Sequence, residues 1–277
     1  TSRKFILMKK KIAIIGSGIA GLTVANLFKE NSIFEVMVYE KEKTLSLEEG
    51  YGIQLAPNST SILNKIGLSS IDNKEFSNPS NLNFYSSDNH KICDLNLSRF
   101  NSEEFKYTTL KRSVLIEFLK NKLFANNLRF GKEVKKISQI KEKLLINFKD
   151  NTNDLVDFIV VSDGVFSNTK SIVENKSIQP VYNGSIAIRT ILKNLPESNY
   201  DKNSISLIML KNAHIVIYPI NKKGELNVVC IIRQKLSNNI DLKALIKKEI
   251  ISQNKNLENL FENKLEYWPI YTSKKPS

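Results

Sequence analysis

The chain has 277 residues, of which 41% are hydrophobic and 25% are charged. These proportions are ordinary for a soluble globular protein, and the length allows one large or two modest domains with a sizeable core. No uninterrupted apolar stretch is long enough to span a bilayer as a helix, which argues against a transmembrane segment and favours a cytoplasmic protein.

The net charge of +13 raises the question of nucleic-acid binding, because 41 Lys and Arg residues face 28 Asp and Glu residues. However, the lysines are spread along the whole chain, and no interleaving of aromatic and basic residues of the RNA-binding type is present. We therefore predict a solvated lysine surface and no nucleic-acid partner, with some attraction for anionic cofactors and acidic substrates.

The two cysteines, Cys93 and Cys230, lie far apart in the sequence and match no metal-binding or redox spacing. We predict two buried free thiols in a reducing cytoplasm and no metal site.

The strongest signal is a strand–helix–strand pattern near the N-terminus. Residues 11–15 predict a buried parallel strand, residues 19–30 a helix, and residues 34–39 a second strand. The segment 16–21 between the first strand and the helix has the spacing GxGxxG, and Glu40 follows the second strand. Together these features define a βαβ dinucleotide-binding motif in its expected context.

Each part of this motif has its own physical role. Gly16 permits the tight turn out of the strand, Gly18 lets the chain approach a pyrophosphate, and Gly21 lets the helix pack closely on the sheet. The helix N-terminus offers unpaired N–H groups to phosphates, and Glu40 can accept hydrogen bonds from ribose hydroxyls. The residues assigned to the cofactor by this motif are Gly16, Gly18, Ile19, Ala20, Gly21 and Glu40.

A signal peptide is the competing interpretation of this region, because residues 8–28 have a basic start and an apolar middle. The glycine spacing, the lack of a cleavage site before a polar mature start, and the strand ending at Glu40 argue against it. The chain begins at Thr1, and we expect Met8 to be the true start.

Further along the chain, the pattern alternates between helical and strand periodicity. The expected elements are a polar loop at 41–49, a helix at 59–66 ended by Gly67, a hairpin of strands 82–86 and 91–97, a helix at 112–124, strands at 128–137, 144–148 and 155–161, strands at 185–192, 205–210, 214–220 and 226–233, and a charged helix at 241–253. This order predicts a parallel α/β unit interleaved with antiparallel sheet.

Two further positions are candidates for ligand contacts. Arg112 opens the helix at 112–124, where a cation opposes the helix dipole, so it is either a ligand for a phosphate or an exposed arginine. Asp163 and Gly164 follow an apolar strand, where ligands of open α/β sheets bind, although Asp-Gly is also common in plain turns.

Together these motifs resemble the FAD-dependent aromatic hydroxylases, which include the salicylate, para-hydroxybenzoate, kynurenine and ubiquinone-pathway monooxygenases. The motifs that carry the resemblance are GxGxxG with Glu40, the run GYGIQLAPN at 50–58, Arg112-x-x-Leu115-x-x-x-Leu119, Asp163-Gly164-x-x-Ser167, Tyr182-x-Gly184-x-x-Ala187-x-Arg189, Tyr218-Pro219 and Trp268-Pro269-Ile270-Tyr271. The resemblance extends from Lys11 to the end of the chain.

The resemblance implies an α/β fold in which a Rossmann-like FAD-binding domain with a parallel sheet is interleaved with a mainly antiparallel substrate-domain sheet. The FAD-binding domain would comprise residues 8–80 and 100–178, and the substrate sheet residues 81–99 and 179–272.

The resemblance also assigns cofactor contacts. Arg112 would contact FAD, Asp163 would lie near both FAD and the passing NAD(P)H, and Gly52 and Ile53 would lie near the flavin. NAD(P)H would reduce FAD, reduced FAD would capture O₂, and the flavin hydroperoxide would hydroxylate an aromatic or other ring substrate.

Substrate contacts are assigned to single residues on or beside the predicted strands, and the sequence names no catalytic residue. Gln54, Arg189, His214 and Tyr218 are the candidates. A histidine without partners is more often a half-buried strand residue than a ligand, which applies to His214, and Arg189 could equally be a cation at a sheet edge.

The chain departs from the family pattern in three places. Val161 and Ser162 replace the usual Gly-Ala before Asp163, and Lys170 replaces an arginine. The later Gly-Asp motif, which holds the ribityl part of FAD, is absent, so we expect a C-terminally truncated fragment.

Two alternatives therefore stay open: a non-catalytic or weakly FAD-binding remnant, and an NAD(P)-dependent reductase. The oligomeric state is undetermined.

Overall fold

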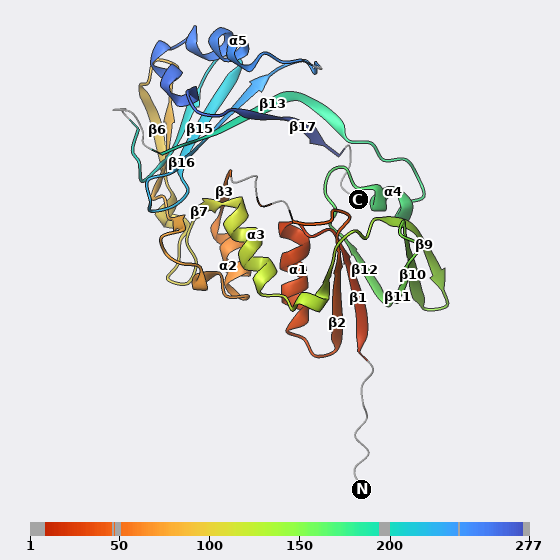
Figure 1. The fold of residues 1–277 in the computed structure, drawn as a ribbon. Coiled ribbons are helices and arrows are strands. Elements are labelled where there is room, and N and C mark those ends of the chain that lie inside the picture. Colours follow the sequence, from red (N-terminus) through yellow and green to blue (C-terminus); the bar gives the residue numbers. More distant parts are fainter. Residues whose placement is uncertain (1–8, 46, 48–50, 194–199, 238, 274–277) are drawn as a thin grey trace. The chain divides into compact units, whose positions relative to one another are not determined.

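The computed structural model describes residues 9–45, 47, 51–193, 200–237 and 239–273 (Figure 1). Met8, the expected start, and Gly50 of the 50–58 run lie outside the described residues. The chain forms two compact units. Of the described residues, those within 1–48 and 115–180 belong with residue 273 to the first unit, and those within 49–114 and 181–272 belong to the second.

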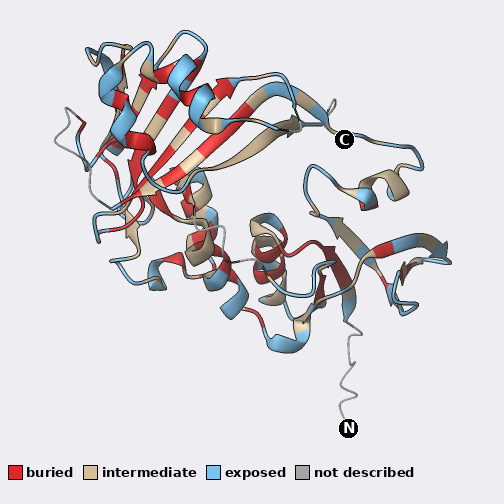
Figure 2. Cartoon of the chain, turned by 45° about the horizontal axis from the view of Figure 1, so that its top comes forward, coloured by how far each residue is buried: buried red, intermediate tan, exposed pale blue. Residues whose placement is uncertain are grey.

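A four-stranded parallel sheet forms the centre of the first unit. Its strand order is β12-β1-β2-β8, with bounds Phe158–Val161, Lys10–Ile15, Phe34–Tyr39 and Leu128–Arg129. In register, Ile15 pairs with both Tyr39 and Val161, so these strands end at one edge of the sheet. The strands β1 and β2 are nearly continuous apolar runs that are buried (Figure 2), as expected for parallel strands covered on both faces.

The helix α1 (Ile19–Lys29) connects β1 to β2, which confirms the predicted strand–helix–strand unit. Its buried side chains include Leu22 and Ala25. The buried Asn26 amide donates to the carbonyl oxygens of Leu22 and Leu119, each at 2.8 Å, and so ties α1 to the end of α3 (Arg112–Asn121).

An antiparallel three-stranded sheet completes the first unit, with the short helix α4 (Asn168–Val173) beside it. Its strands are β9 (Val134–Ile140), β10 (Lys143–Phe148) and β11 (Asn153–Val156). Side chains from this sheet and from the parallel sheet share one hydrophobic core, formed by Ala13, Ile15, Met37, Tyr39, Val134, Ile146, Phe148 and Val156.

Two predicted strands are wrong in their continuity. The expected strand 128–137 is divided into β8 and β9, because Gly131 has a φ of +69° and turns the chain out of the parallel sheet. The expected strand 155–161 is divided into β11 and β12 at Asp157, whose carboxylate accepts a 2.8 Å hydrogen bond from the backbone N–H of Lys11. Because of these two divisions, β8 and β12 belong to the parallel sheet, whereas β9 and β11 belong to the antiparallel sheet.

A seven-stranded sheet dominates the second unit. Its order is β17-β13-β16-β15-β14-β5-β6, with bounds Glu266–Thr272, Val181–Leu192, Leu226–Arg233, Ala213–Pro219, Ile205–Met209, Asn81–Tyr85 and Lys91–Asn96. All neighbours are antiparallel except β14 and β5. The predicted hairpin and the predicted antiparallel block therefore belong to the same sheet.

One face of this sheet is covered by the C-terminal helical segment. This segment comprises α5 (Leu242–Ile246), a π-helical turn at Lys247–Ile251 and a 3-10 helix at Lys255–Phe261, where one continuous helix over 241–253 was expected. The covered face contributes buried strand residues to the largest core, among them Ile186, Ile188, Ile215, Val228 and Cys230.

A small sheet of β3 (Gly52–Leu55), β7 (Thr108–Lys111) and β4 (Phe76–Ser77) also lies in the second unit, with α2 (Pro57–Asn64) after β3. The segments 51–80 and 100–114 thus group with the large sheet, whereas the resemblance assigns them to the FAD-binding domain. The grouping follows from hydrogen bonds: the Gly52 N–H donates to Asn227 Oδ1 at 2.8 Å, and the Thr109 hydroxyl donates to the Pro219 carbonyl at 2.5 Å. Their assignment to a cofactor-binding domain stays a prediction.

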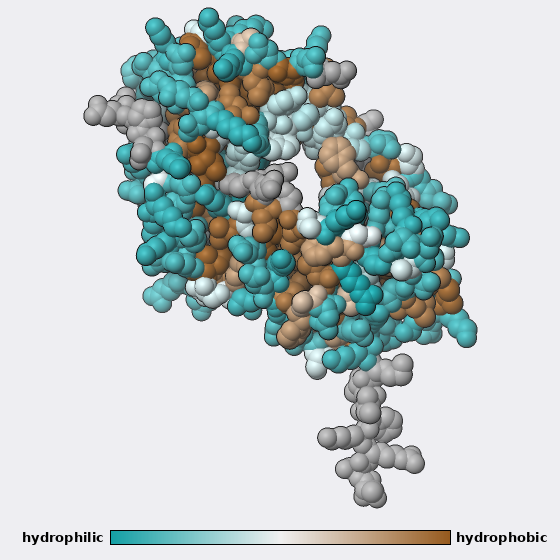
Figure 3. Space-filling model, viewed as in Figure 1, coloured by the Kyte–Doolittle hydropathy of each residue, from teal (hydrophilic) through white to brown (hydrophobic). Residues whose placement is uncertain are grey.

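The surface in Figure 3 is predominantly hydrophilic, which fits a chain with many dispersed lysines. In the part of the chain that the structure describes, no helix is both long enough and apolar enough to cross a membrane.

The prediction of two buried thiols is wrong for Cys93, which is exposed on the edge strand β6. Cys230 is buried in the core, and burial raises the pKa of its thiol.

Because the thiolate is the reactive form, we expect one fast-reacting thiol in the native protein and a second only after unfolding. Titration with a thiol reagent with and without denaturant measures this, and Cys93→Ser should remove the fast phase alone. Two equally fast thiols in the folded protein would contradict the structure.

Candidate functional site

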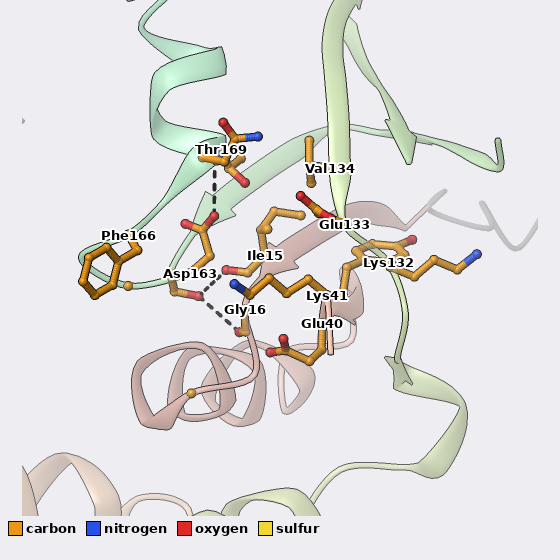
Figure 4. Close-up of a pocket in the computed structure, with 15 residues that line it drawn as sticks. Ile15, Gly16, Glu40, Lys41, Lys132, Glu133, Val134, Asp163, Phe166 and Thr169 are labelled. Atoms are coloured by element: carbon orange, nitrogen blue, oxygen red, sulfur yellow. Dashed lines mark hydrogen bonds between the residues drawn. The ribbon is translucent and has the colours of Figure 1, made fainter. Parts of the chain in front are cut away.

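A hollow of about 230 Å³ lies at the carboxyl edge of the parallel sheet in the first unit (Figure 4). It is lined by the residues that follow all four strands, together with the start of α4. The lining residues are Ile15, Gly16, Gly18, Tyr39, Glu40, Lys41, Lys132, Glu133, Val134, Ser162, Asp163, Gly164, Phe166, Asn168 and Thr169. Four predicted cofactor residues, Gly16, Gly18, Glu40 and Asp163, are therefore brought together here.

The three glycines of the motif have different surroundings. Gly16 has a φ of +100°, and a Cβ there would lie 2.6 Å from the Ser162 carbonyl oxygen. A Cβ on Gly21 would lie only 2.0 Å from the Gly16 carbonyl oxygen. A Cβ on Gly18, in contrast, would meet no protein atom within 4 Å. Gly16 and Gly21 are thus required by the fold, whereas Gly18 leaves space open to a ligand.

The N-terminus of α1 is free to receive an anion. Gly18 is its N-cap and provides no side-chain hydrogen bond, and the first turn, which begins with Ile19 and Ala20, has no acidic residue. The N–H groups at a helix start lack intrahelical partners and carry a partial positive charge. Phosphate groups are the usual ligands of such a helix end when it follows a glycine-rich loop.

Glu40 is anchored to the glycine-rich loop. Its Oε2 accepts hydrogen bonds from the backbone N–H of Ser17 at 2.8 Å and from the Ser17 hydroxyl at 2.7 Å, and its Oε1 accepts from the Glu42 N–H at 3.0 Å. Burial alone would raise the pKa of this carboxyl, but the hydrogen bonds from Glu42 and Ser17 outweigh burial and lower it. Glu40 is therefore ionised at neutral pH and fixes the loop.

Asp163 has one carboxylate oxygen without a partner. Its Oδ2 accepts a long hydrogen bond of 3.4 Å from the Thr169 N–H, whereas Oδ1 is buried and has no hydrogen-bond partner among the described residues. The preceding Ser162, at the position where the family has alanine, donates its hydroxyl to the Ile15 carbonyl at 2.8 Å and so ties β12 to β1. A ligand hydroxyl would satisfy the remaining oxygen of Asp163.

Sequence reasoning missed the loop after β8. The N–H of Lys132 donates to the Glu40 carbonyl at 2.8 Å, and the Lys132 ammonium forms an ion pair with Asp150. The signal was available in principle, since ligands bind where parallel strands end. The pattern at 128–137 predicts one continuous strand, which leaves no room for a loop after Arg129.

In the second unit, three predicted substrate residues lie on the sheet face opposite the helical cover. Arg189 pairs with Val229, and Val229 pairs with Val216 of β15. Because side chains alternate along a strand, His214 and Tyr218 lie on the same face as Val216 and therefore as Arg189.

The side chains of Arg189, Tyr218 and His214 have different environments. The Arg189 guanidinium stacks 5.6 Å from the centre of the Trp268 ring, and its buried Nε has no hydrogen-bond partner in the described part of the chain. Burial raises the pKa of Tyr218 to about 12, so its hydroxyl stays protonated at neutral pH. Partial burial lowers the pKa of His214 below its ordinary 6.5, so its imidazole is neutral.

The remaining predicted residues have local partners in the second unit. Gln54 Oε1 accepts a 2.8 Å hydrogen bond from the Tyr107 hydroxyl, and Ile53 pairs with Leu110. A Cβ on Gly52 would lie 2.6 Å from a methyl group of Ile220, so close packing alone explains this glycine.

Arg112 begins α3, and its backbone N–H donates to the Tyr51 carbonyl at 2.8 Å. Its role toward FAD, like those of Gly52 and Ile53 toward the flavin, stays a prediction. Among the described residues, no group of three or more His, Cys, Asp or Glu side chains could hold a metal ion.

Comparison with known proteins supports a nucleotide site in the first unit. A family model described as an NAD(P)-binding Rossmann-like domain matches residues 14–48. The chain is 27% identical over 190 residues to 6-hydroxynicotinate 3-monooxygenase of Pseudomonas fluorescens, a match that covers 65% of this chain and 47% of the relative. It is also 27% identical over 221 residues to 3-amino-4-hydroxybenzoate 2-monooxygenase of Streptomyces platensis, covering 78% of this chain and 54% of the relative.

Solved structures extend the likeness to the whole fold. Klebsiella pneumoniae HpxO in complex with FAD and uric acid superposes with a TM-score of 0.83 at 17% identity, over 98% of this chain and 71% of that chain. A salicylate hydroxylase substrate complex superposes with a TM-score of 0.77 at 15% identity, over 96% of this chain and 69% of that chain.

These matches confirm the resemblance to the FAD-dependent aromatic hydroxylases and the α/β fold class with a Rossmann-like domain and a mainly antiparallel sheet. In particular, the chain is similar to the monooxygenases that act on 6-hydroxynicotinate and 3-amino-4-hydroxybenzoate. It spans about half the length of these relatives, 47% and 54%.

The glycines allow a test that separates fold from ligand. We expect Gly21→Ala to destabilise the protein by about 3 kcal/mol or to prevent folding, because its Cβ would overlap the Gly16 carbonyl. Gly18→Ala should cost no more than about 1 kcal/mol, because its Cβ would meet no protein atom and only the preference for Gly over Ala at an N-cap is lost. Chemical unfolding followed by circular dichroism measures both. Equal destabilisation by the two substitutions would contradict the assigned packing.

The anchoring of Glu40 predicts a pH dependence. Since its folded-state pKa lies below the ordinary 4.5, ionised Glu40 stabilises the fold above that pH, and the stabilisation is lost as the pH falls through the folded value. Glu40→Gln should therefore lower the melting temperature at pH 7 and reduce its dependence on pH below 4.5. Exposed Glu117→Gln is the matched control and should leave the melting curve unchanged. Identical acid profiles for wild type and Glu40→Gln would show that the Ser17 contacts contribute nothing.

Proposed function

We propose that this chain provides the FAD-binding and substrate-binding parts of an FAD-dependent, NAD(P)H-using monooxygenase that hydroxylates an aromatic or other ring substrate with O₂. One observation carries the proposal: the glycine-rich loop, the ionised Glu40 and the half-satisfied Asp163 meet at one edge of a parallel sheet. The relatives named above act on ring substrates, and HpxO is named in complex with FAD.

The residues fit the adenosine and pyrophosphate part of FAD. Gly18 leaves space where a Cβ would otherwise stand, and the uncapped start of α1 offers N–H donors to the pyrophosphate. Each carboxylate oxygen of Glu40 can accept more than one hydrogen bond, so a ribose hydroxyl can join the donors from Ser17 and Glu42. The free Oδ1 of Asp163 would accept from another hydroxyl of the cofactor.

The chemistry that FAD supplies when bound is oxidation of NAD(P)H and activation of O₂ for transfer of one oxygen atom to a ring. This chain's own residues would bind and orient the substrate. We propose that Arg189, His214 and Tyr218, on one sheet face, provide a cation, a neutral imidazole and a protonated hydroxyl. Gln54, held by Tyr107, would add an amide.

We also propose a cytoplasmic location. Cys93 and Cys230 are free thiols, and unpaired cysteines are typical of reducing compartments. The absence of a nucleic-acid partner stays a prediction from the dispersed charge.

The proposal is tested by flavin uptake and by two matched aspartate substitutions. Asp163→Asn should weaken FAD binding by about ten-fold, because hydrogen bonds to charged groups are the stronger ones, and should leave the melting temperature nearly unchanged. Asp157→Asn is the structural control. It should lower the melting temperature, because this carboxylate accepts from Lys11 and Lys10, and should leave FAD affinity unchanged.

FAD affinity is measured by quenching of flavin fluorescence, and activity by flavin-dependent oxidation of NAD(P)H. A protein that takes up no FAD at saturating concentration would contradict the proposal for this chain and favour a non-binding remnant. Substrate-linked NAD(P)H oxidation without any flavin would instead favour a reductase.

A further inference from the structure

A buried asparagine that the sequence patterns did not indicate joins the small sheet of the second unit to its large sheet. Asn227 is the second residue of β16, is only 1% exposed, and pairs directly with Tyr218 of β15. Buried polar side chains normally have hydrogen-bond partners for their polar atoms. The two ends of the Asn227 amide therefore need to be accounted for separately.

The amide oxygen of Asn227 is engaged by the small sheet. Its Oδ1 accepts a 2.8 Å hydrogen bond from the backbone N–H of Gly52 in β3. Because a backbone N–H can only donate, this contact fixes the orientation of the amide, with its oxygen toward β3 and its NH₂ group directed away from the Gly52 N–H. A Cβ on Gly52 would lie 2.7 Å from Asn227 Cβ and 2.8 Å from Tyr218 Cε2, so the three residues meet closely.

The NH₂ group of Asn227 lacks a partner of its own. Nδ2 is buried and makes no hydrogen bond of normal geometry in the part of the chain that the structure describes. Burial of an unsatisfied donor costs about 1–3 kcal/mol, so an acceptor is expected nearby. The hydroxyl oxygen of Tyr218 fits this role. Burial raises the pKa of Tyr218, whereas the charge of Arg189 and the amides of Gln54 and Asn227 lower it.

The amide of Gln54 in β3 is oriented in the same way. Its Oε1 accepts a 2.8 Å hydrogen bond from the Tyr107 hydroxyl, which leaves the NH₂ group to donate to Tyr218. An NH₂ group has two hydrogens, so Gln54 can donate to Tyr218 and to a substrate. Two amide donors directed at one hydroxyl oxygen occupy its lone pairs and leave the O–H hydrogen of Tyr218 for another acceptor.

We propose that Asn227 is a positioning residue, which holds the start of β3 through Gly52 and orients the Tyr218 hydroxyl so that its hydrogen is presented to an acceptor atom of the substrate. The assignment deepens the proposed function and rests on it only for the role of Tyr218 toward a substrate. Asn227 acts through Tyr218 and has no part in the chemical step itself.

A purely structural role is the rival interpretation, because the hydrogen bond to Gly52 alone would join the two sheets. Asn227→Asp separates the two roles. Aspartate has nearly the same volume and keeps an acceptor oxygen for the Gly52 N–H, but it replaces the NH₂ donor by a second oxygen. A structural role predicts no change at Tyr218 in this variant, whereas a positioning role predicts weaker stabilisation of the ionised hydroxyl.

The test replaces Tyr218 by 3,5-difluorotyrosine in the full chain and follows its ionisation by ¹⁹F NMR. Ring fluorination makes the phenol more acidic, so the titration can be followed while the protein stays folded. We expect Asn227→Asp to lower the ionised fraction of residue 218 about ten-fold at a fixed pH below the midpoint, because one hydrogen bond to a charged group is lost. Hydrogen exchange of the Gly52 N–H should stay slow. Asn227→Leu should lower the ionised fraction similarly and also accelerate exchange at Gly52.

Ser77→Ala is the matched control. It removes a 3.0 Å hydrogen bond from the Ser77 hydroxyl to the Asn221 carbonyl, which also joins the small sheet to the β15–β16 connection. It should lower the melting temperature slightly and leave the titration of residue 218 unchanged. If the Asn227 variants do not fold, the unsubstituted side chain provides the answer, because its Nδ2 resonance should shift in ¹⁵N NMR as residue 218 ionises.

Three outcomes would each overturn the assignment: an unchanged titration in Asn227→Asp, an equal change in Ser77→Ala, or an Asn227 resonance that does not respond to ionisation of residue 218. Because no flavin is present, these results stand apart from the FAD titration. A chain that binds FAD but shows none of these effects refutes the positioning role alone. A chain that shows them but takes up no FAD keeps the orientation of Tyr218 and refutes the proposed function.

Discussion

The close approach of α1 to β1 is the constraint on which the first unit depends. No side chain fits between Gly21 and the Gly16 carbonyl, and the positive φ of Gly16 turns the chain directly from strand to helix. This contact directs the helix N-terminus toward the edge where the parallel strands end. Glu40 reinforces it from the neighbouring strand, because its carboxylate holds Ser17 in the middle of the turn. One acidic side chain on the second strand therefore shapes the loop that follows the first.

The division of two apparent strands supplies the rest of that edge. Gly131 releases the chain from the parallel sheet after β8, and Asp157 returns it to that sheet as β12. Each change of sheet leaves a polar loop beside the glycine-rich turn, one with Lys132 and one with Asp163. The site is thus built from four chain segments, and the segment with Lys132 is the one that no sequence motif indicated.

The two faces of the large sheet in the second unit are covered to different extents. One face is packed by the C-terminal helical segment and carries aliphatic residues and the buried Cys230. The other face is only partly covered, since Tyr218 is buried in a smaller core whereas His214 is exposed, and it carries the tyrosine, histidine and arginine side chains that the resemblance associates with substrate. Burying one face fixes the register, and the register then determines which polar side chains can meet on the other.

The sequence by itself determined the strand–helix–strand unit, the three glycines with Glu40, and the resemblance to FAD-dependent aromatic hydroxylases, because these depend on short-range spacing and hydrophobic periodicity. It could not determine that β8 and β12 join the parallel sheet, that Lys132 lines the hollow at the carboxyl edge of that sheet, or that residues 51–80 group with the large sheet. It also misjudged Cys93, whose exposure follows from the edge position of β6. Only the tertiary structure decided these points, since strand pairing between distant segments and the choice of sheet face arise from long-range packing that local patterns do not encode.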